Sequence, residues 1–271
     1  MCRLYGFRSN FPRKVECELI RAQNSLITQS LQDERGTSNP HGWGLGTYSN
    51  GAPNVIRQLD PAYDSEEFRW TAAKVHTCNV MAHVRRATIG KISLENTHPF
   101  EHGKWMFVHN GNIKAFQSIR QMILDAMGPS DRQSIQGDTD SEHVFKYIMY
   151  LHEQRSHFPI VDILRDGIKQ VIDWSQKADP GSEIALNIIM SNGDEIGGLR
   201  YGRSLWYMRR NAVHPCGVCG GALHVEKDPG KDYRAVIVAS EPITDDEEWT
   251  EIPEGSLFRI DNEIALNITS L

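Results

Sequence analysis

The order of strand-like and helix-like segments restricts the folds open to this chain more than any single motif does. Short apolar or alternating runs, which are typical of strands, occupy the sequence up to about residue 109 and return over 184–260. Helical patterns fill the interval, over 116–126, after Thr139 and over 160–176. Because sheets and helices must each bury an apolar face, this order predicts two sheets with helices packed outside them, an α+β fold.

Several local predictions follow from the first sixty residues. The first strand is expected over 2–7, because Ser9-Asn10-Phe11-Pro12 has the composition of a strand-ending turn. Apolar residues at helical spacing predict a helix within 15–31, and Asn50-Gly51 predicts a hairpin turn. The glycines of Gly42-x-Gly44-x-Gly46 have the wrong spacing for a dinucleotide-binding loop. We expect them to form a loop beside the functional site, where small residues let the backbone approach a ligand.

Length and composition describe an ordinary globular protein. At about 150 residues per domain, 271 residues without a linker-like stretch predict one domain over 1–271. The 29 Lys and Arg against 35 Asp and Glu give a formal net charge of −6 without a basic cluster, which argues against nucleic-acid binding. The apolar runs are too short for a bilayer and the N-terminus lacks signal-peptide features, so we expect a cytoplasmic protein without membrane contact.

A cysteine directly follows the initiator methionine. Aminopeptidases remove Met1 most readily before a small residue, which would leave Cys2 with a thiol and a free α-amino group. An α-amine has an ordinary pKa of about 8, so part of it is neutral at pH 7 and can accept the thiol proton, directly or through a water. Cys2 could therefore act as both nucleophile and base, although a cysteine at a strand position is more often simply buried.

Three further segments carry groups that suit a carboxamide substrate. Arg85 ends a strand-like run with a planar fork of donors that fits a carboxylate. Asn110 and Gly111 offer a side-chain amide and an unobstructed backbone N–H, the two donors of an oxyanion hole, although an isolated Asn-Gly pair is more often a hairpin turn. Asp140 stands in the first turn of a predicted helix, where an acid caps the helix or faces a substrate.

Taken together, these segments resemble the class II glutamine amidotransferases of the N-terminal-nucleophile hydrolase superfamily, and above all its stand-alone, YafJ-like branch. The resemblance extends over nearly the whole chain, and a late segment, Glu241–Trp249, also has its counterpart in that branch. Each string alone is weak evidence, but six strings in the family's order are very unlikely to occur by chance. The strings are Met1-Cys2, His41-Gly42-Trp43-Gly44, Ala82-His83-Val84-Arg85, Glu95-Asn96-Thr97-His98-Pro99-Phe100, His109-Asn110-Gly111 and Thr139-Asp140-Ser141-Glu142.

The resemblance implies a four-layer αββα sandwich and a reaction through a γ-glutamyl thioester, with no metal or organic cofactor. Where better-known members have an aromatic residue after the motif arginine, this chain has Arg86, so substrate contacts just beyond Arg85 can differ. Because Cys2 would carry its own base, three nearby histidines are expected to be structural: His83, His98 and His109. The implied roles are nucleophile for Cys2, oxyanion hole for Asn110 and Gly111, and substrate binding for Arg85 (α-carboxylate), Asp140 (α-ammonium) and Thr88.

Three functions remain open at this point, all with glutamine or a γ-glutamyl compound as the small-molecule ligand. The favoured one is hydrolysis of the γ-amide. A second is an ammonia-supplying subunit of a two-protein amidotransferase, because family members that make amino sugars or purines carry a synthase domain, whereas 271 residues suffice for the amidohydrolase alone. The third is a glutamine-binding subunit without catalysis, which a retained Met1 would indicate.

The remaining cysteines raise the question of a metal. Cys216-x-x-Cys219 with His224 nearby could make most of a zinc site. However, a second C-x-x-C is absent, and Cys17 and Cys78 lie far away in the sequence. We therefore expect no metal and a glycine-rich loop with incidental thiols.

Overall fold

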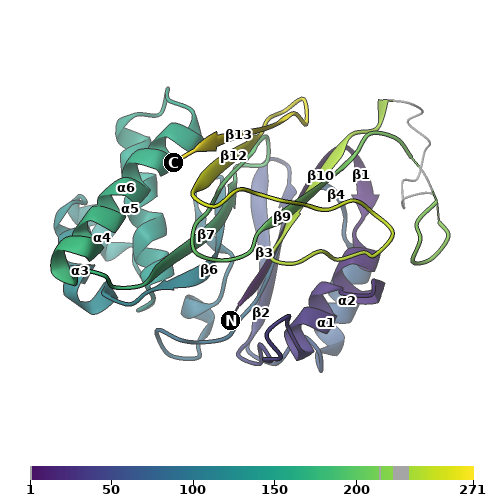
Figure 1. The fold of residues 1–271 in the computed structure, drawn as a ribbon, viewed down its shortest axis with the longest axis horizontal. Helices are drawn as coiled ribbons and strands as arrows, with labels where there is room; N and C mark the ends of the chain where they lie inside the picture. The colour runs from purple at the N-terminus through teal and green to yellow at the C-terminus, as the bar shows by residue number, and fades with distance from the viewer. Residues whose placement is uncertain (1, 214, 222–231) are drawn as a thin grey trace.

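A computed structural model describes residues 2–213, 215–221 and 232–271. Two antiparallel sheets lie face to face, and helices cover the outer face of each sheet (Figure 1). The predicted pair of sheets with helices outside them is confirmed. The arrangement is the αββα sandwich that the family resemblance implies.

The first sheet has the order β11-β9-β10-β1-β4-β2-β3, so the strand that follows Cys2 occupies its centre. All its neighbouring strands pair antiparallel. Its strands are β1 (Arg3–Lys14), β2 (Trp43–Ser49), β3 (Ala52–Gln58), β4 (His76–Val84), β9 (Trp206–Arg210), β10 (Ala235–Ala239) and β11 (Thr250–Glu251).

The second sheet has the order β13-β12-β8-β7-β6-β5 and is also antiparallel. The strand carrying the Asn110-Gly111 pair lies next to its short edge strand. Its strands are β5 (Phe100–His102), β6 (Trp105–Ile113), β7 (Ile184–Ser191), β8 (Ile196–Arg200), β12 (Ser256–Ile260) and β13 (Leu266–Ser270).

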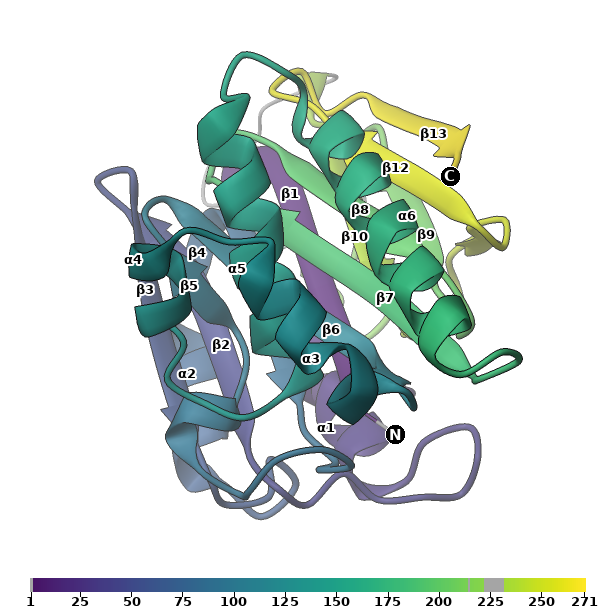
Figure 2. The same cartoon turned by 90° about the vertical axis from the view of Figure 1, so that its left-hand side faces the viewer.

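The helices form the two outer layers. A π-helical turn (Cys17–Arg21), α1 (Leu26–Leu31) and α2 (Glu66–Lys74) cover the first sheet. The other side carries α3 (Phe116–Asp125), α4 (Pro129–Gln133), α5 (Asp140–Gln154) and α6 (Ile160–Ala178), and Figure 2 shows α3, α5 and α6 in front of the second sheet. A 3₁₀ turn (Leu94–Asn96) lies between β4 and β5.

Three hydrophobic clusters fill the spaces between the four layers. Alternation along β1 explains how one strand serves two of them, because successive side chains of a strand point to opposite faces. Leu4 joins the cluster between the sheets, whereas Tyr5 and Phe7 join the cluster under α1 and α2. Each such apolar side chain contributes about 1.5–3 kcal/mol when it is fully buried.

The N-terminal elements depart from the predictions at two points. β1 continues to Lys14 through Pro12, which falls where the β1–β4 register shifts and a missing N–H costs no ladder bond. The expected helix within 15–31 is two short helical segments, because Asn24 leaves the helix and donates its backbone N–H to the carbonyl of Ile243 (3.1 Å).

The glycine-rich stretch at 42–46 was expected as a loop, and this prediction is wrong. Residues 43–46 form the start of β2, which Gly42 directly precedes, and the Asn50-Gly51 turn joins β2 to β3 as predicted. A Cβ on Gly44 would lie 2.0 Å from the carbonyl oxygen of His98. The absence of a side chain at Gly44 therefore leaves room for the backbone of His98, not for a ligand.

Within the three described ranges, no helix combines the length and the apolar character needed to cross a lipid bilayer.

Candidate functional site

Cys2 lies immediately before the central strand β1 and touches the backbone that follows β4. The N–H of Arg86 donates to Sγ of Cys2 over 3.3 Å, and the thiol faces the carbonyl oxygen of the same residue at 3.4 Å. Burial raises the pKa of the Cys2 thiol above its ordinary value, against the lowering effect of the Arg86 hydrogen bond. The resting thiol is therefore protonated at pH 7, and its use as a nucleophile requires a base.

A small pocket beside Cys2 collects residues from four separated segments of the chain. Five of the six predicted site residues line it: Cys2, Arg85, Thr88, Gly111 and Asp140. The sixth, Asn110, is buried next to the pocket and does not line it. The other lining residues are Arg86, Ala87, Ile89, Asn96, His98, His109, Thr139 and Ser141.

Arg85 follows the last residue of β4, and its main chain is fixed by the segment before β2. Its N–H donates to the carbonyl of Gly42 (2.8 Å), and its own carbonyl accepts from His41 (2.9 Å). The side chain is buried; Nη2 donates to the carbonyl of Ile89 (3.4 Å), while Nη1 has no hydrogen-bond partner among the described residues. An unpaired buried guanidinium nitrogen is costly, so this atom is a natural receptor for an anionic ligand.

Asn110 and Gly111 lie within β6 and pair with β7, so they are not a hairpin turn. The side-chain amide of Asn110 donates to Oγ of Ser240 over 3.4 Å, and its Oδ1 has no partner in the described part of the chain. A Cβ on Gly111 would lie 1.9 Å from the carbonyl oxygen of Ala185. Only glycine fits there without displacing β7.

Asp140 is the first residue of α5, and Thr139 is its N-cap, with the hydroxyl accepting from Glu142 N–H (3.2 Å). The Asp140 carboxylate accepts from the N–H of Ile113 (2.9 Å) through one oxygen and from that of Ser141 (2.8 Å) through the other. It thereby joins the start of α5 to the end of β6. A carboxylate has about four lone-pair positions, so it can still accept from an ammonium group in the pocket.

Three buried histidines lie at the pocket: His98 and His109 line it, and His83 packs against His98. Burial and the nearby Arg85 lower the pKa of His83 to about 3, and burial also lowers the pKa values of His98 and His109. Both ring nitrogens of His109 are occupied, by Oγ of Ser141 (2.8 Å) and the carbonyl of Ala185 (3.1 Å). These imidazoles are neutral at pH 7, and His109 has no free nitrogen with which to act as a base.

One group that holds Cys2 was missed in the sequence. The Arg3 guanidinium donates to the carbonyl of Cys2 (3.0 Å), lies 2.5 Å from Oε1 of Glu241 and 3.1 Å from Oδ2 of Asp33. The hydroxyl of Ser240 accepts from the N–H of Leu4 at 3.0 Å. The sequence does contain an indication of this contact, because the segment Glu241–Trp249 is part of the family resemblance. The resemblance implies no role for that segment.

The comparisons with known proteins agree with the site. A family model described as class II glutamine amidotransferases matches residues 1–268. The chain belongs to the class II glutamine amidotransferases, a family of enzymes.

Two curated relatives match nearly the whole of both chains. YafJ of Escherichia coli, which is named as a glutamine amidotransferase, is 24% identical and covers 94% of this chain and 95% of its own. A γ-glutamyl-hercynylcysteine sulfoxide hydrolase of Mycobacterium tuberculosis is 25% identical over 100% of this chain and 97% of its own. A solved glutamine aminotransferase class-II domain protein of Silicibacter pomeroyi, 21% identical, has a TM-score of 0.67 and covers 100% of this chain and 99% of its own, which supports the fold.

Proposed function

We propose that this enzyme hydrolyses the γ-amide bond of glutamine or of a γ-glutamyl compound through a thioester on Cys2. The observation that carries the proposal is the gathering of Cys2, Arg85, Gly111 and Asp140 around one pocket from four segments of the chain. A thiol, an anion receptor and a carboxylate in one pocket suit a substrate that has a carboxylate and an ammonium group at one end and an amide at the other.

The proposed reaction starts with removal of Met1, which frees the α-amine of Cys2. This amine takes the thiol proton, and the thiolate forms a C–S bond with the γ-carbonyl carbon while the carbonyl electrons move to oxygen. Asn110 and Gly111 donate to that oxyanion. Its collapse breaks the C–N bond, and the proton passes to the leaving nitrogen. Water then adds to the thioester, the C–S bond breaks, and the γ-glutamyl group leaves as glutamate.

The surroundings of Cys2 favour its own amine over a histidine as the base. His109 lacks a free ring nitrogen, and His98 has a pKa well below its ordinary value because it is buried. His41 accepts the N–H of Ala87 through Nδ1 (2.9 Å). An α-amine with a pKa of about 8 is the stronger base among these groups.

Hydrolysis is the better supported outcome for the thioester. The Mycobacterium tuberculosis relative, which matches this chain over its full length, carries the name of a γ-glutamyl hydrolase. On this proposal the leaving group is ammonia or an amine, and the acyl acceptor is water. The glutamyl end is read by Arg85 and Asp140, while Thr88, exposed at the pocket, contacts the substrate.

The test uses the chain expressed with its native N-terminus, and intact mass establishes that Met1 is absent. Glutamate release is measured from glutamine and from a γ-glutamyl anilide, and hydroxylamine is added to trap the acyl group as a γ-glutamyl hydroxamate. We expect release and trapping by the wild type and by Cys78→Ala, whose thiol lies in β4. The Cys2→Ala variant, which keeps a small residue after Met1, should do neither.

Two outcomes separate the alternatives. A processed chain that releases no glutamate from either probe, and forms no adduct at Cys2 with a glutamine-mimicking electrophile, would refute the proposal. Glutamate release from glutamine that rises strongly with a co-purified partner would identify an ammonia-supplying subunit instead of a self-sufficient hydrolase.

A further inference from the structure

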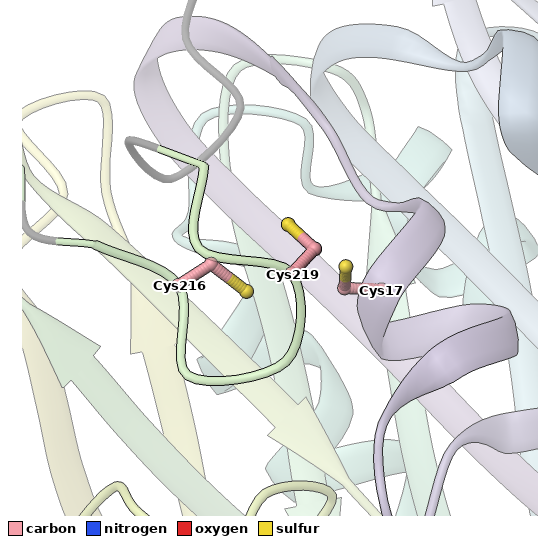
Figure 3. A group of neighbouring side chains, drawn as sticks. All are labelled: Cys17, Cys216 and Cys219. Atoms are coloured by element: carbon pink, nitrogen blue, oxygen red, sulfur yellow. The ribbon is translucent and has the colours of Figure 1, made fainter.

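Three cysteines from opposite ends of the sequence meet at one point, remote from Cys2. Cys17 begins the π-helical turn after β1, and Cys216 and Cys219 belong to the loop after β9. Their three sulfur atoms all lie within 4.8 Å of one another. Figure 3 shows Cys17 on the helical side and the other two on the facing loop. The expectation of incidental thiols rested in part on the long sequence separation between Cys17 and the C-x-x-C pair. The fold brings these residues together.

The loop is shaped around its two cysteines. The N–H of Gly220 donates to the carbonyl of Cys216 (2.7 Å), and the N–H of Cys216 donates to the carbonyl of Gly221 (2.6 Å). Gly220 has φ +73°, a left-handed conformation that favours glycine. The N–H of Gly221 also donates to Sγ of Cys219 (3.4 Å), which favours a thiolate there. The tight turn brings both sulfur atoms within 4.8 Å of the sulfur of Cys17.

The burial of the three thiols is graded. Cys17 is 3% exposed and Cys216 is 9% exposed, whereas Cys219 lies at the surface. An ion bound here would be enclosed on two sides and could enter from the solvent past Cys219. Cys17 follows the far end of the 12-residue strand β1, whereas Cys2 directly precedes its first residue, so such an ion would take no part in the chemistry at Cys2.

We propose that Cys17, Cys216 and Cys219 bind a zinc ion as three thiolate ligands. A tetrahedral Zn²⁺ with Zn–S bonds of about 2.3 Å separates its sulfur ligands by about 3.8 Å, so a small rotation of the side chains closes the site. Each thiol loses its proton as its Zn–S bond forms, and water or an added ligand takes the fourth position. His224, considered with this motif, lies outside the described residues.

The alternatives fit these residues less well. An iron–sulfur cluster is held by about four cysteine ligands, whereas three of the described cysteines meet at this point. A disulfide would join two of the sulfur atoms and leave the third thiol alone. Thiolates are soft ligands, which favour zinc or copper(I), and a C-x-x-C pair is a common half of a zinc site.

The bound ion would fasten the loop after β9 to the start of the helical layer. In the reduced chain the thiols of this loop lie next to the thiol of the π-helical turn, but no disulfide joins them. Zinc should therefore raise the thermal stability of the chain and slow proteolysis of the loop, and leave the activity at Cys2 nearly unchanged.

The test is made on the full-length, reduced chain. After removal of metal, Zn²⁺ alone is added, the excess is washed away, and the metal is counted by mass spectrometry. We expect about one Zn²⁺ per wild-type chain and about tenfold less in Cys17→Ser and Cys219→Ser. Cys78→Ser, which removes a thiol outside the cluster, is the matched control and should keep full zinc content.

A second measurement does not depend on how well the variants fold. Co²⁺ added to the wild-type apo chain should give the strong near-ultraviolet absorption of sulfur-to-cobalt charge transfer, and Zn²⁺ should abolish it. Three results would overturn the proposal: wild-type zinc no higher than in Cys17→Ser, absence of the thiolate–cobalt band, or a disulfide within the cluster in the zinc-treated chain. None of these readouts depends on activity at Cys2.

Discussion

Nε of Arg3 lies 2.5 Å from Oε1 of Glu241, so the residue after Cys2 is held by a carboxylate 238 positions later in the chain. The same guanidinium donates to the carbonyl of Cys2. Both side chains are almost fully buried. The position of Cys2 therefore depends on a segment that does not line the pocket.

Replacing Glu241 by glutamine keeps the shape of this side chain and removes its charge. We expect kcat to fall about tenfold with little change in KM, and stability to fall by about 3 kcal/mol, because Arg3 loses one of its buried partners. Steady-state kinetics and urea unfolding measure the two effects. Glu251→Gln, which alters the exposed partner of Arg200, is the control. A loss of stability with unchanged kcat would refute the positioning role.

Arg85→Lys retains the positive charge but loses the planar fork of donors. We expect KM for glutamine to rise about tenfold to a hundredfold, with a smaller effect on kcat. A rise of this size corresponds to the loss of one or two charge-assisted hydrogen bonds. Arg57→Lys, at a half-exposed pair with Glu101, should leave KM unchanged. Equal KM values for wild type and Arg85→Lys would show that the substrate carboxylate binds elsewhere.

Asn110→Ala tests the proposed oxyanion hole. Removing one such donor typically lowers kcat by about a hundredfold to a thousandfold. Asn112→Ala, two positions further along β6 and outside the pocket lining, should lower kcat by less than about threefold. The measurement is kcat with a γ-glutamyl anilide. Similar losses in both variants would point to damage to the strand instead of the loss of a specific donor.

Glu18 makes the fold sensitive to strong acid. Although burial acts in the opposite direction, Arg13 and Arg210 lower the pKa of Glu18 from 4.5 to about 2. Its stabilising contribution is therefore complete above pH 4.5 and is lost as the pH falls toward 2, by about 3 kcal/mol in total. Urea unfolding across this range should show that loss, and Glu18→Gln should lose about 3–5 kcal/mol at pH 7. The exposed Glu66→Gln variant should match the wild type.

The buried histidines predict a separate loss of stability at milder acidity. His83, His98 and His109 stay neutral in the fold because burial lowers their pKa values, whereas in the unfolded chain they gain protons below pH 6.5. Each of these histidines then lowers the free energy of unfolding by about 1.4 kcal/mol per pH unit below 6.5. His98→Asn should reduce the slope of unfolding free energy against pH by about one proton. An unchanged slope in His98→Asn would contradict the neutral assignment.

The order of strands and helices was predictable because it depends on local periodicity and on the burial of one face of each element. The site strings around Cys2, Arg85, Asn110 and Asp140 could also be found, since each is short and continuous in the sequence. Five of the six candidates line one pocket. Their chemical roles stay predictions.

Contacts between distant segments were not predictable in the same way. The break in the expected helix within 15–31 depends on Asn24 bonding to Ile243, which no local pattern reveals. Glu18 pairs with two arginines that come from different strands, Arg13 of β1 and Arg210 of β9. Cys17 meets Cys216 only because β1 and β10 pair and bring their flanking segments together. In each case the fold, rather than spacing along the chain, sets the partner.

The central place of β1 has a practical consequence for anyone who prepares this enzyme. Cys2 directly precedes β1, which lies between β10 and β4, and it lines the pocket. On the proposed mechanism, an affinity tag fused ahead of Cys2 would block its α-amine and crowd the pocket. β13, by contrast, is an edge strand that ends beside Leu271. A purification handle belongs after Leu271, and apparent inactivity of an N-terminally tagged preparation would say nothing about the native enzyme.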